Sequence, residues 1–135
     1  MSDRMGVTVT NYERSKAFYT AALAPLGIVL VVEYPASTTG NTEVAGFGLQ
    51  IGAIPLTRPE FWINQGTPKL PLAHVAFRVP SREVVEAFHA AALAAGGRDN
   101  GVPGLRPYDH PENYYAAFVL DPDGNNIEVV CQADS

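Results

Sequence analysis

The chain has 135 residues, of which 47% are hydrophobic and 17% charged, with a formal net charge of −5. This length suits one domain with a buried core, and the acidic balance argues against nucleic acid or an anionic membrane as a partner. The sequence has no apolar run of the ~18 residues that a membrane span needs, no recognisable signal peptide, and only Cys131, which excludes an internal disulfide. We therefore expect a single cytoplasmic domain over residues 1–135.

The first half of the chain reads as a strand, a helix and three further strands. Asn11 is a typical helix N-cap, apolar residues follow it at helical spacing, and Gly27 stops the helix. Residues 64–71, which include a Gly and two Pro, form the best linker in the chain. The expected elements are a strand at 6–10, a helix after Asn11, strands at 28–33 and 43–51, an irregular connection at 54–59 and a strand at 61–63.

The second half starts the same order again. Ser81 is a second N-cap, and Gly97 ends the helix that follows. When residues 4–27 are laid over 74–97 without a gap, Val, Glu, Phe, Leu and Gly fall on residues of the same type. We infer an internal repeat of two β-α-β-β-β modules. The expected elements here are a strand at 73–79, a helix at 82–95 and a long loop at 98–113.

Residues 114–130, with the sequence YYAAFVLDPDGNNIEVV, predict a β-hairpin, because two strand-forming runs flank a turn with Pro and Gly. The second strand contains Glu128 between apolar neighbours, so this carboxylate needs either open solvent or a partner. Alternation along the first strand of the second module places Val75 and Phe77 under the helix and His74 on the opposite face. The same reasoning puts Glu128 on that face, so His74 and Glu128 are expected to converge.

Each module is too small for a stable core of its own, so the two must combine. Helices cover only one face of each sheet, which leaves the other faces to line a cleft. The expected fold class is α+β, with two tandem βαβββ modules whose curved mixed sheets pair into a cup with the helices on the outside. Module one covers about 4–63, the linker 64–71, and module two about 72–131.

Three stretches, which together cover about half of the chain, carry a family resemblance. They are NYERSKAFYTAALAPLG at 11–27, LAHVAFRVPSREVVEAFHAAALAAGG at 72–97, and the hairpin at 114–130. In this order they resemble the vicinal oxygen chelate superfamily of glyoxalase I, bleomycin-resistance proteins and extradiol dioxygenases. The resemblance implies paired modules that form a cup, often with a divalent metal at its base, and a homodimer. In metal-binding members the ligands, usually His or Gln and Glu, come from the first and last strands of each module.

The resemblance assigns His74 and Glu128 to the ligand positions of module two. The equivalent first-strand position of module one is Arg4, and the last-strand position falls near Trp62. Only two of four expected ligands are therefore present, of types suited to Zn²⁺, Mn²⁺, Fe²⁺ or Ni²⁺. Catalytic metal sites usually keep about three protein ligands. Two alternatives stay open, a divalent metal held by His74 and Glu128, and a metal-free cup in which Arg4 pairs with Glu128.

Two functions correspond to these alternatives. In the first, the protein is a glyoxalase-like lyase or isomerase, or has an activity related to the dioxygenases, and Glu128 is the catalytic residue that moves a proton. In the second, a metal-free cup sequesters a small molecule, as bleomycin-resistance proteins do. The residues expected to contact the small molecule are Arg4, Trp62, Arg106, Tyr108 and Tyr115.

Overall fold

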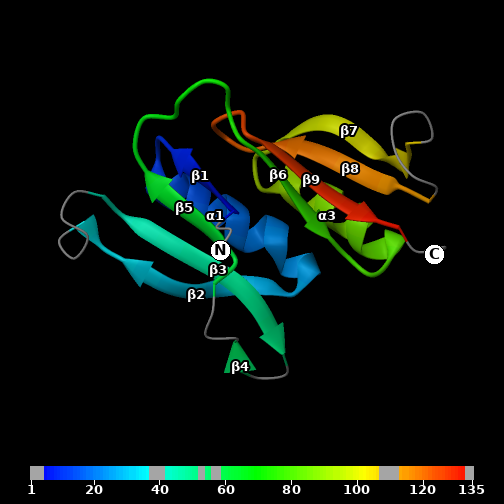
Figure 1. Cartoon of the computed structure of the whole chain (residues 1–135), viewed down its shortest axis with the longest axis horizontal. Helices are drawn as coiled ribbons and strands as arrows, with labels where there is room; N and C mark the ends of the chain where they lie inside the picture. Colours follow the sequence, from blue (N-terminus) through cyan, green and yellow to red (C-terminus); the bar gives the residue numbers. More distant parts are fainter. Residues whose placement is uncertain (1–4, 37–41, 52–53, 56–58, 107–112, 133–135) are drawn as a thin grey trace.

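The computed structural model describes residues 5–36, 42–51, 54–55, 59–106 and 113–132. Its elements follow the order expected for two βαβββ modules (Figure 1). They are β1 (Met5–Val9), α1 (Tyr12–Leu23), the 3₁₀ turn η1 (Ala24–Leu26), β2 (Ile28–Tyr34), β3 (Val44–Ile51), β4 (Ile54–Pro55), β5 (Phe61–Gln65), β6 (His74–Arg78), α3 (Arg82–Ala94), β7 (Arg98–Leu105), β8 (Tyr115–Leu120) and β9 (Asn126–Cys131). Neither described helix is long and apolar enough to span a membrane.

Each module forms its own mixed sheet. The strand order is β1-β5-β3-β2 in the first sheet, with the short β4 beside β3, and β6-β9-β8-β7 in the second. The first strand of each module runs parallel to the last, β1 with β5 and β6 with β9. β1 and β6 are edge strands of their sheets, and the sheets do not close into a barrel. The predicted α+β fold of two tandem modules is confirmed.

The internal repeat extends to the strand register. Gly6 of β1 pairs with Trp62 of β5, and Ala76 of β6 pairs with Glu128 of β9. The ungapped alignment of the two halves makes Ala76 the counterpart of Gly6. Trp62 is therefore the counterpart of Glu128 in module one.

Both helices begin where the sequence predicts. Asn11 Oδ1 accepts the backbone N–H of Arg14 at 3.1 Å, and Ser81 Oγ accepts that of Val84 at 3.4 Å. These side chains satisfy N–H groups that lack a partner in the first helical turn. Gly27 adopts a φ of 77° directly after η1, a left-handed conformation in which a side chain would be strained, so the first helical segment ends there.

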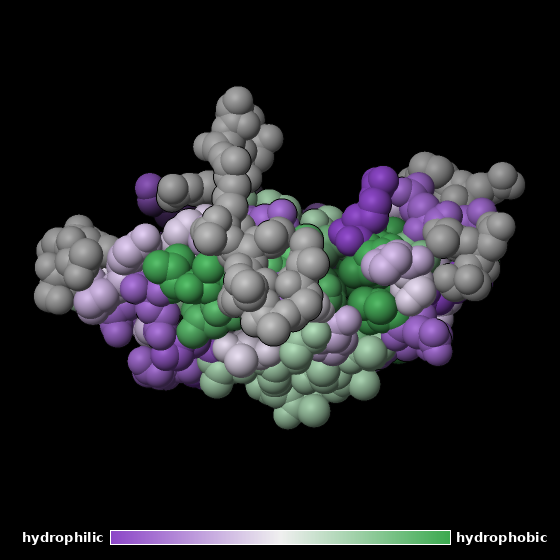
Figure 2. Space-filling view, turned by 90° about the horizontal axis from the view of Figure 1, so that it is seen from below, coloured by the Kyte–Doolittle hydropathy of each residue, from purple (hydrophilic) through white to green (hydrophobic). Residues whose placement is uncertain are grey.

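One cluster of buried apolar side chains joins the two modules. The helices α1 and α3 pack against each other, and each also packs on the sheet of its own module. Phe61 of β5 meets Phe77 of β6 with 5.5 Å between ring centroids, and Tyr19 of α1 lies 4.9 Å from Phe61. Apolar side chains gather at the middle of the face shown in Figure 2, with hydrophilic ones toward both ends. The modules thus share one core.

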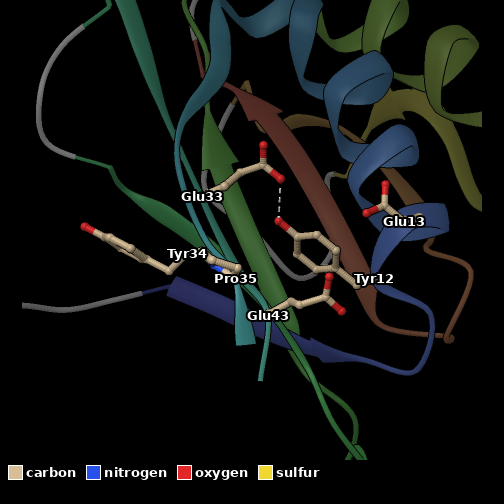
Figure 3. A pocket seen from close by; sticks show the side chains of 6 residues that line it. All are labelled: Tyr12, Glu13, Glu33, Tyr34, Pro35 and Glu43. Atoms are coloured by element: carbon tan, nitrogen blue, oxygen red, sulfur yellow. Dashed lines mark hydrogen bonds between the residues drawn. The ribbon is translucent and has the colours of Figure 1, made fainter. Parts of the chain in front are cut away.

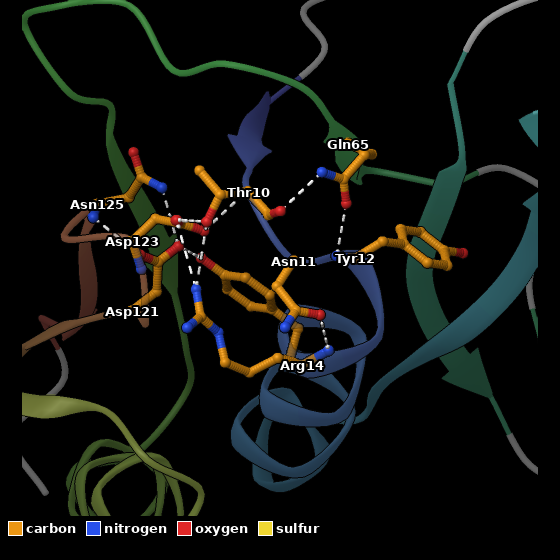
Figure 4. Close-up of polar contacts among 9 residues, drawn as sticks. Thr10, Asn11, Tyr12, Arg14, Gln65, Asp121, Asp123 and Asn125 are labelled. Atoms are coloured by element: carbon orange, nitrogen blue, oxygen red, sulfur yellow. Dashed lines mark hydrogen bonds and ion pairs between the residues drawn. The ribbon is translucent and has the colours of Figure 1, made fainter.

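A polar cluster at the hairpin turn fastens module one to module two (Figure 4). The buried Asp121 carboxylate accepts the backbone N–H groups of Asp123 at 2.9 Å and Asn125 at 2.8 Å, and Asn125 Nδ2 at 2.9 Å. It also accepts the hydroxyl of Tyr19, which reaches it from α1. Asp123 accepts the backbone N–H of Thr10 at 3.1 Å, from the end of β1. The turn therefore has bonds to both modules.

Residues 98–105 form the strand β7, and the prediction of a loop there was wrong. β7 pairs with β8, and its register shifts on both sides of Gly101. Gly101 and Pro103 disfavour a strand inside a sheet but are tolerated in an edge strand with bulges. The ungapped repeat carried the correct signal, because Gly97 aligns with Gly27 and a strand follows Gly27.

Candidate functional site

The second sheet turns one face away from α3, and this face is exposed along the edge strand β6. Burial alternates along β6, where Val75 and Phe77 are buried while His74, Ala76 and Arg78 are exposed. This is the alternation that the sequence predicts, with the apolar residues toward the helix. The polar side chains of this face form the candidate site.

Glu128 lies on β9, beside β6, and its side chain is only 4% exposed. Its Oε1 atom lies 2.9 Å from His74 Nε2, and its Oε2 atom accepts the hydroxyl of Tyr114. Because an ionised carboxylate only accepts hydrogen bonds, His74 Nε2 is the donor of the first bond. The predicted convergence of His74 and Glu128 is confirmed. Tyr114 is a third member that the sequence reasoning missed.

Tyr115, which the sequence reasoning placed in the cup, lies on the other face of the sheet. Its hydroxyl donates to Glu86 Oε2 on α3 at 2.7 Å, and the Arg82 guanidinium lies 4.9 Å from its ring centre. Adjacent strand residues point to opposite faces, so Tyr114 takes the position that was expected of Tyr115. Alternation counted back along β8 was the signal that would have found it.

Tyr114→Phe is expected to lower the free energy of unfolding by about 1–3 kcal/mol, because the buried Glu128 carboxylate loses a donor. Burial and the bond to Glu128 raise the pKa of Tyr114 to about 12, so the wild-type hydroxyl stays protonated at neutral pH. Tyr115→Phe is the matched control, since its bond to Glu86 lies at an exposed position, and we expect a loss of about 0.5–1 kcal/mol. Urea denaturation of both variants measures the difference, and equal losses would contradict it.

Arg106 lies on the same face as His74, and the ring of Phe118 lies between the two side chains. Its Nη2 and Nη1 atoms donate to two backbone carbonyls of β7 at 2.7 and 3.0 Å, and its guanidinium lies 5.5 Å from the ring centre of Phe118. The Phe118 ring in turn lies 6.3 Å from that of His74. A Cβ at Gly101 would come within 2.9 Å of Phe118, so glycine leaves the room that the Phe118 ring occupies. The predicted residue Arg106 thus lies in one row with His74.

Trp62 lies in the first sheet, on the side away from α1. Its ring stacks on that of Tyr34, with 6.5 Å between centroids and 11° between planes. The indole also covers Gly46, where a Cβ would come within 2.9 Å of it. An indole N–H is a donor with no lone pair for a metal. The module-one counterpart of Glu128 therefore has no metal-ligating atom.

The metal-ligating side chains among the described residues do not fit a catalytic divalent metal. His74 and Glu128 supply two ligands, and no group of three or more His, Cys, Asp or Glu side chains within the described ranges could hold an ion. A catalytic site needs about three protein ligands and an open position. Arg4 and Tyr108 lie outside the described residues, as does the expected pairing of Arg4 with Glu128.

A cavity of about 330 Å³ lies between β1 and β6, where module one meets module two. Ala76 lines it, and Ala76 is the cross-strand partner of Glu128. Arg78 also lines it, and the positive charge of Arg78 counteracts the rise in the pKa of Tyr114, which places that charge near the cluster. Ala76 and Arg78 thus belong both to the cavity lining and to the β6 face that carries His74, while Tyr114, Glu128 and His74 do not line the cavity themselves.

A second cavity, of about 260 Å³, lies beside α1 and is acidic (Figure 3). Tyr12 donates to Glu33 Oε1 at 2.8 Å, and Lys16 Nζ lies 2.9 Å from the same atom. The bonds from Lys16 and Tyr12 hold the pKa of Glu33 below its usual value. These contacts tie α1 to β2, and we assign the cluster a structural role. The lining residues are Tyr12, Glu13, Glu33, Tyr34, Pro35 and Glu43.

Glu33→Gln is expected to make the stability of the fold depend less on pH between about pH 7 and pH 3. The folded-state pKa of Glu33 is depressed, so its carboxylate stabilises the fold above the unfolded-state pKa of about 4.3. This contribution is lost as the pH falls through the lower folded-state pKa. The variant should melt below the wild type at pH 7, and the gap should narrow toward about pH 3. Thermal unfolding at both pH values tests this, and a gap that stays constant with pH would contradict it.

Comparison with known proteins gives one family. The family model described as "Glyoxalase/Bleomycin resistance protein/Dioxygenase superfamily" matches residues 2–129. A glyoxalase/bleomycin resistance protein from Albidiferax ferrireducens T118 is 28% identical with a TM-score of 0.66, and the match covers 96% of each chain. No curated protein matches the chain.

Two further solved structures extend the comparison. A mutant of glyoxalase I from Zea mays is 25% identical with a TM-score of 0.67, and the match covers 96% of this chain but 46% of the maize chain. The chain thus spans just under half of that protein. A genomically encoded fosfomycin resistance protein from Listeria monocytogenes, at 14% identity and a TM-score of 0.60, shares the fold.

Proposed function

The chain belongs to the glyoxalase/bleomycin resistance protein/dioxygenase superfamily, and we propose that it binds a small organic molecule without a catalytic metal. The observation that carries this proposal is the position of Trp62, the module-one counterpart of Glu128. With an indole there, the described residues provide two metal ligands rather than three.

The cavity between β1 and β6 supports the binding part of the proposal. Its volume of about 330 Å³ falls at the lower end of the range of roughly 300–1,000 Å³ that is common for small-molecule sites. Most of its lining is apolar, and Glu60 and Arg78 supply the charges. Such sites bind through apolar surface and take their specificity from a few polar groups.

The bond to Glu128 gives the His74 ring a defined orientation. In the neutral imidazole, Glu128 accepts the hydrogen bond from Nε2–H, and the second ring nitrogen, Nδ1, then carries the lone pair. The His74 side chain is 53% exposed, while the Glu128 side chain is buried. His74 therefore presents an acceptor to a bound molecule, and Tyr114 and Glu128 act through the position of its ring.

The same geometry favours proton transfer as a second candidate function. A buried carboxylate that binds one nitrogen of an exposed imidazole stabilises the imidazolium that forms when the other nitrogen takes a proton. In the presence of the protein, 4-methyl-2-oxopentanoate in D₂O should then exchange its C3 protons faster than in buffer. His74→Ala should abolish the acceleration, and exchange that is independent of His74 would exclude this role.

Binding is tested with 4-methylpentanoate, 3-methylbutylamine and 4-methyl-1-pentanol, which share a branched apolar end and differ in charge. We expect at least one of them, with EDTA present, to shift the backbone amide signals of Met5, Ala76 and Arg78 in two-dimensional NMR spectra. The proposal would be overturned by spectra that do not change with any probe up to about 10 mM, or that change only after a divalent metal is added.

A further inference from the structure

The cavity between β1 and β6 has two opposite charges on its wall that do not pair with each other. Glu60 and Arg78 both line it, and both residues are exposed. Among the described residues, neither forms an ion pair within 4.0 Å. Both charged residues therefore belong to the wall of one cavity, and they do not form an ion pair with each other.

The remaining lining of the cavity is largely apolar. Met5, Leu26, Ile28 and Leu49 enter it from four segments of module one, and all except Ile28 are partly exposed. Apolar side chains that line a cavity favour an apolar group of a ligand, since both surfaces leave water on binding. The cavity thus combines an apolar wall with one acid and one base.

We propose that this cavity binds a small zwitterion with an apolar substituent, of the chemical class of an apolar amino acid. The ligand carboxylate bonds to the Arg78 guanidinium, whose planar fork suits two parallel bonds to a carboxylate. The ligand ammonium faces Glu60, and the substituent packs on Met5, Leu26 and Leu49. A ligand with only one charge leaves either Glu60 or Arg78 facing it without a partner.

This inference rests on the proposed function, because it names the ligand class of the same cavity. The two charged clusters of the molecule differ in a way that agrees with it. Glu33 is bonded by Tyr12 and Lys16, whereas Glu60 and Arg78 have no such partners in the described residues. The acid and the base of the β1–β6 cavity are the ones left available to a ligand.

The experiment is isothermal titration calorimetry on the full chain with EDTA present. The ligands are L-leucine and its two singly charged analogues, 4-methylpentanoate and 3-methylbutylamine. We expect L-leucine to bind at least about tenfold more tightly than either analogue. Arg78→Gln should weaken the binding of L-leucine and of 4-methylpentanoate by about tenfold and leave the binding of 3-methylbutylamine unchanged. Glu60→Gln should instead weaken the binding of 3-methylbutylamine by about tenfold and leave that of 4-methylpentanoate unchanged.

The controls are Arg98→Gln and Glu83→Gln, which neutralise exposed charges on β7 and α3 that do not line the cavity. Both should bind all ligands as the wild type does, and unchanged circular dichroism spectra verify the fold of every variant. The zwitterion proposal would be overturned if L-leucine bound no more tightly than the analogues. It would also be overturned if neither Arg78→Gln nor Glu60→Gln changed the binding of L-leucine. Should an analogue or 4-methyl-1-pentanol bind while L-leucine does not, the proposed function stands and this inference falls. If none of the four binds, both fall.

Discussion

Asp121→Ala is expected to lower the free energy of unfolding by about 3–5 kcal/mol, because it removes a buried acceptor that serves four donors. Two of these donors are the backbone N–H groups of Asp123 and Asn125, and a third is the Asn125 amide. The fourth is the buried hydroxyl of Tyr19. Burial and the negative charge of Asp121 raise the pKa of this hydroxyl, so it keeps its proton and stays a donor. An alanine leaves these groups without an acceptor and unfastens α1 from the hairpin turn.

Guanidinium chloride denaturation measures this loss, and two variants apportion it. Tyr19→Phe removes only the bond from α1 to Asp121, and we expect a loss of about 1–3 kcal/mol. The double variant should lose less than the sum of the single losses, since both changes break the same bond. If the two losses of unfolding free energy were additive, or if Asp121→Ala lost less than about 1 kcal/mol, the bonds at the turn would not stabilise the contact between the modules.

Trp62→Glu is expected to create a divalent-metal site with an affinity at least about 100-fold above that of the wild type. The register places this residue where Glu128 lies in the other module, so the new carboxylate would add a third ligand to His74 and Glu128. Loss of even an outer partner of a metal ligand typically changes affinity 10–100-fold. The gain is expected whether the cup is built within one chain or from two copies, because every copy carries all three donors.

Calorimetric titration with Zn²⁺ and Mn²⁺ measures this gain. Trp62→Leu is the matched control, since it removes the same indole and supplies no ligand, and it should not gain affinity. Adding His74→Ala to Trp62→Glu should return the affinity to that of the wild type. A Trp62→Glu protein that binds metal no better than Trp62→Leu would show that the two ligand positions do not converge, and would remove the basis of the metal-free proposal.

Local signals predicted most of the fold. The caps at Asn11 and Ser81, the turn at 121–126 and strand alternation around His74 depend on neighbours within a few residues, and the structure has all of them. The repeat added the pairing of whole modules, because each copy is too small to fold on its own. β7 was missed because its composition is that of a loop, and its place at the sheet edge tolerates Gly and Pro.

The contacts between modules could not be predicted in the same way. The turn sequence indicates that Asp121 bonds its own backbone, but nothing local indicates that Tyr19 reaches it. The cavity between β1 and β6 depends on how the two modules pack together, which alternation within a strand does not specify. Tyr114 differs, since its face follows from alternation along β8, so this residue was within reach of the sequence.

Titration of the wild-type protein with Zn²⁺, Mn²⁺ and Ni²⁺ tests most directly that this chain works without a catalytic metal. Protein purified without chelator should contain no stoichiometric metal, and calorimetry should show no binding tighter than about 100 μM, as two protein ligands give a weak site. One equivalent of tightly bound metal that is lost in His74→Ala would contradict the account. It would mean that residues beyond His74 and Glu128 complete a metal centre.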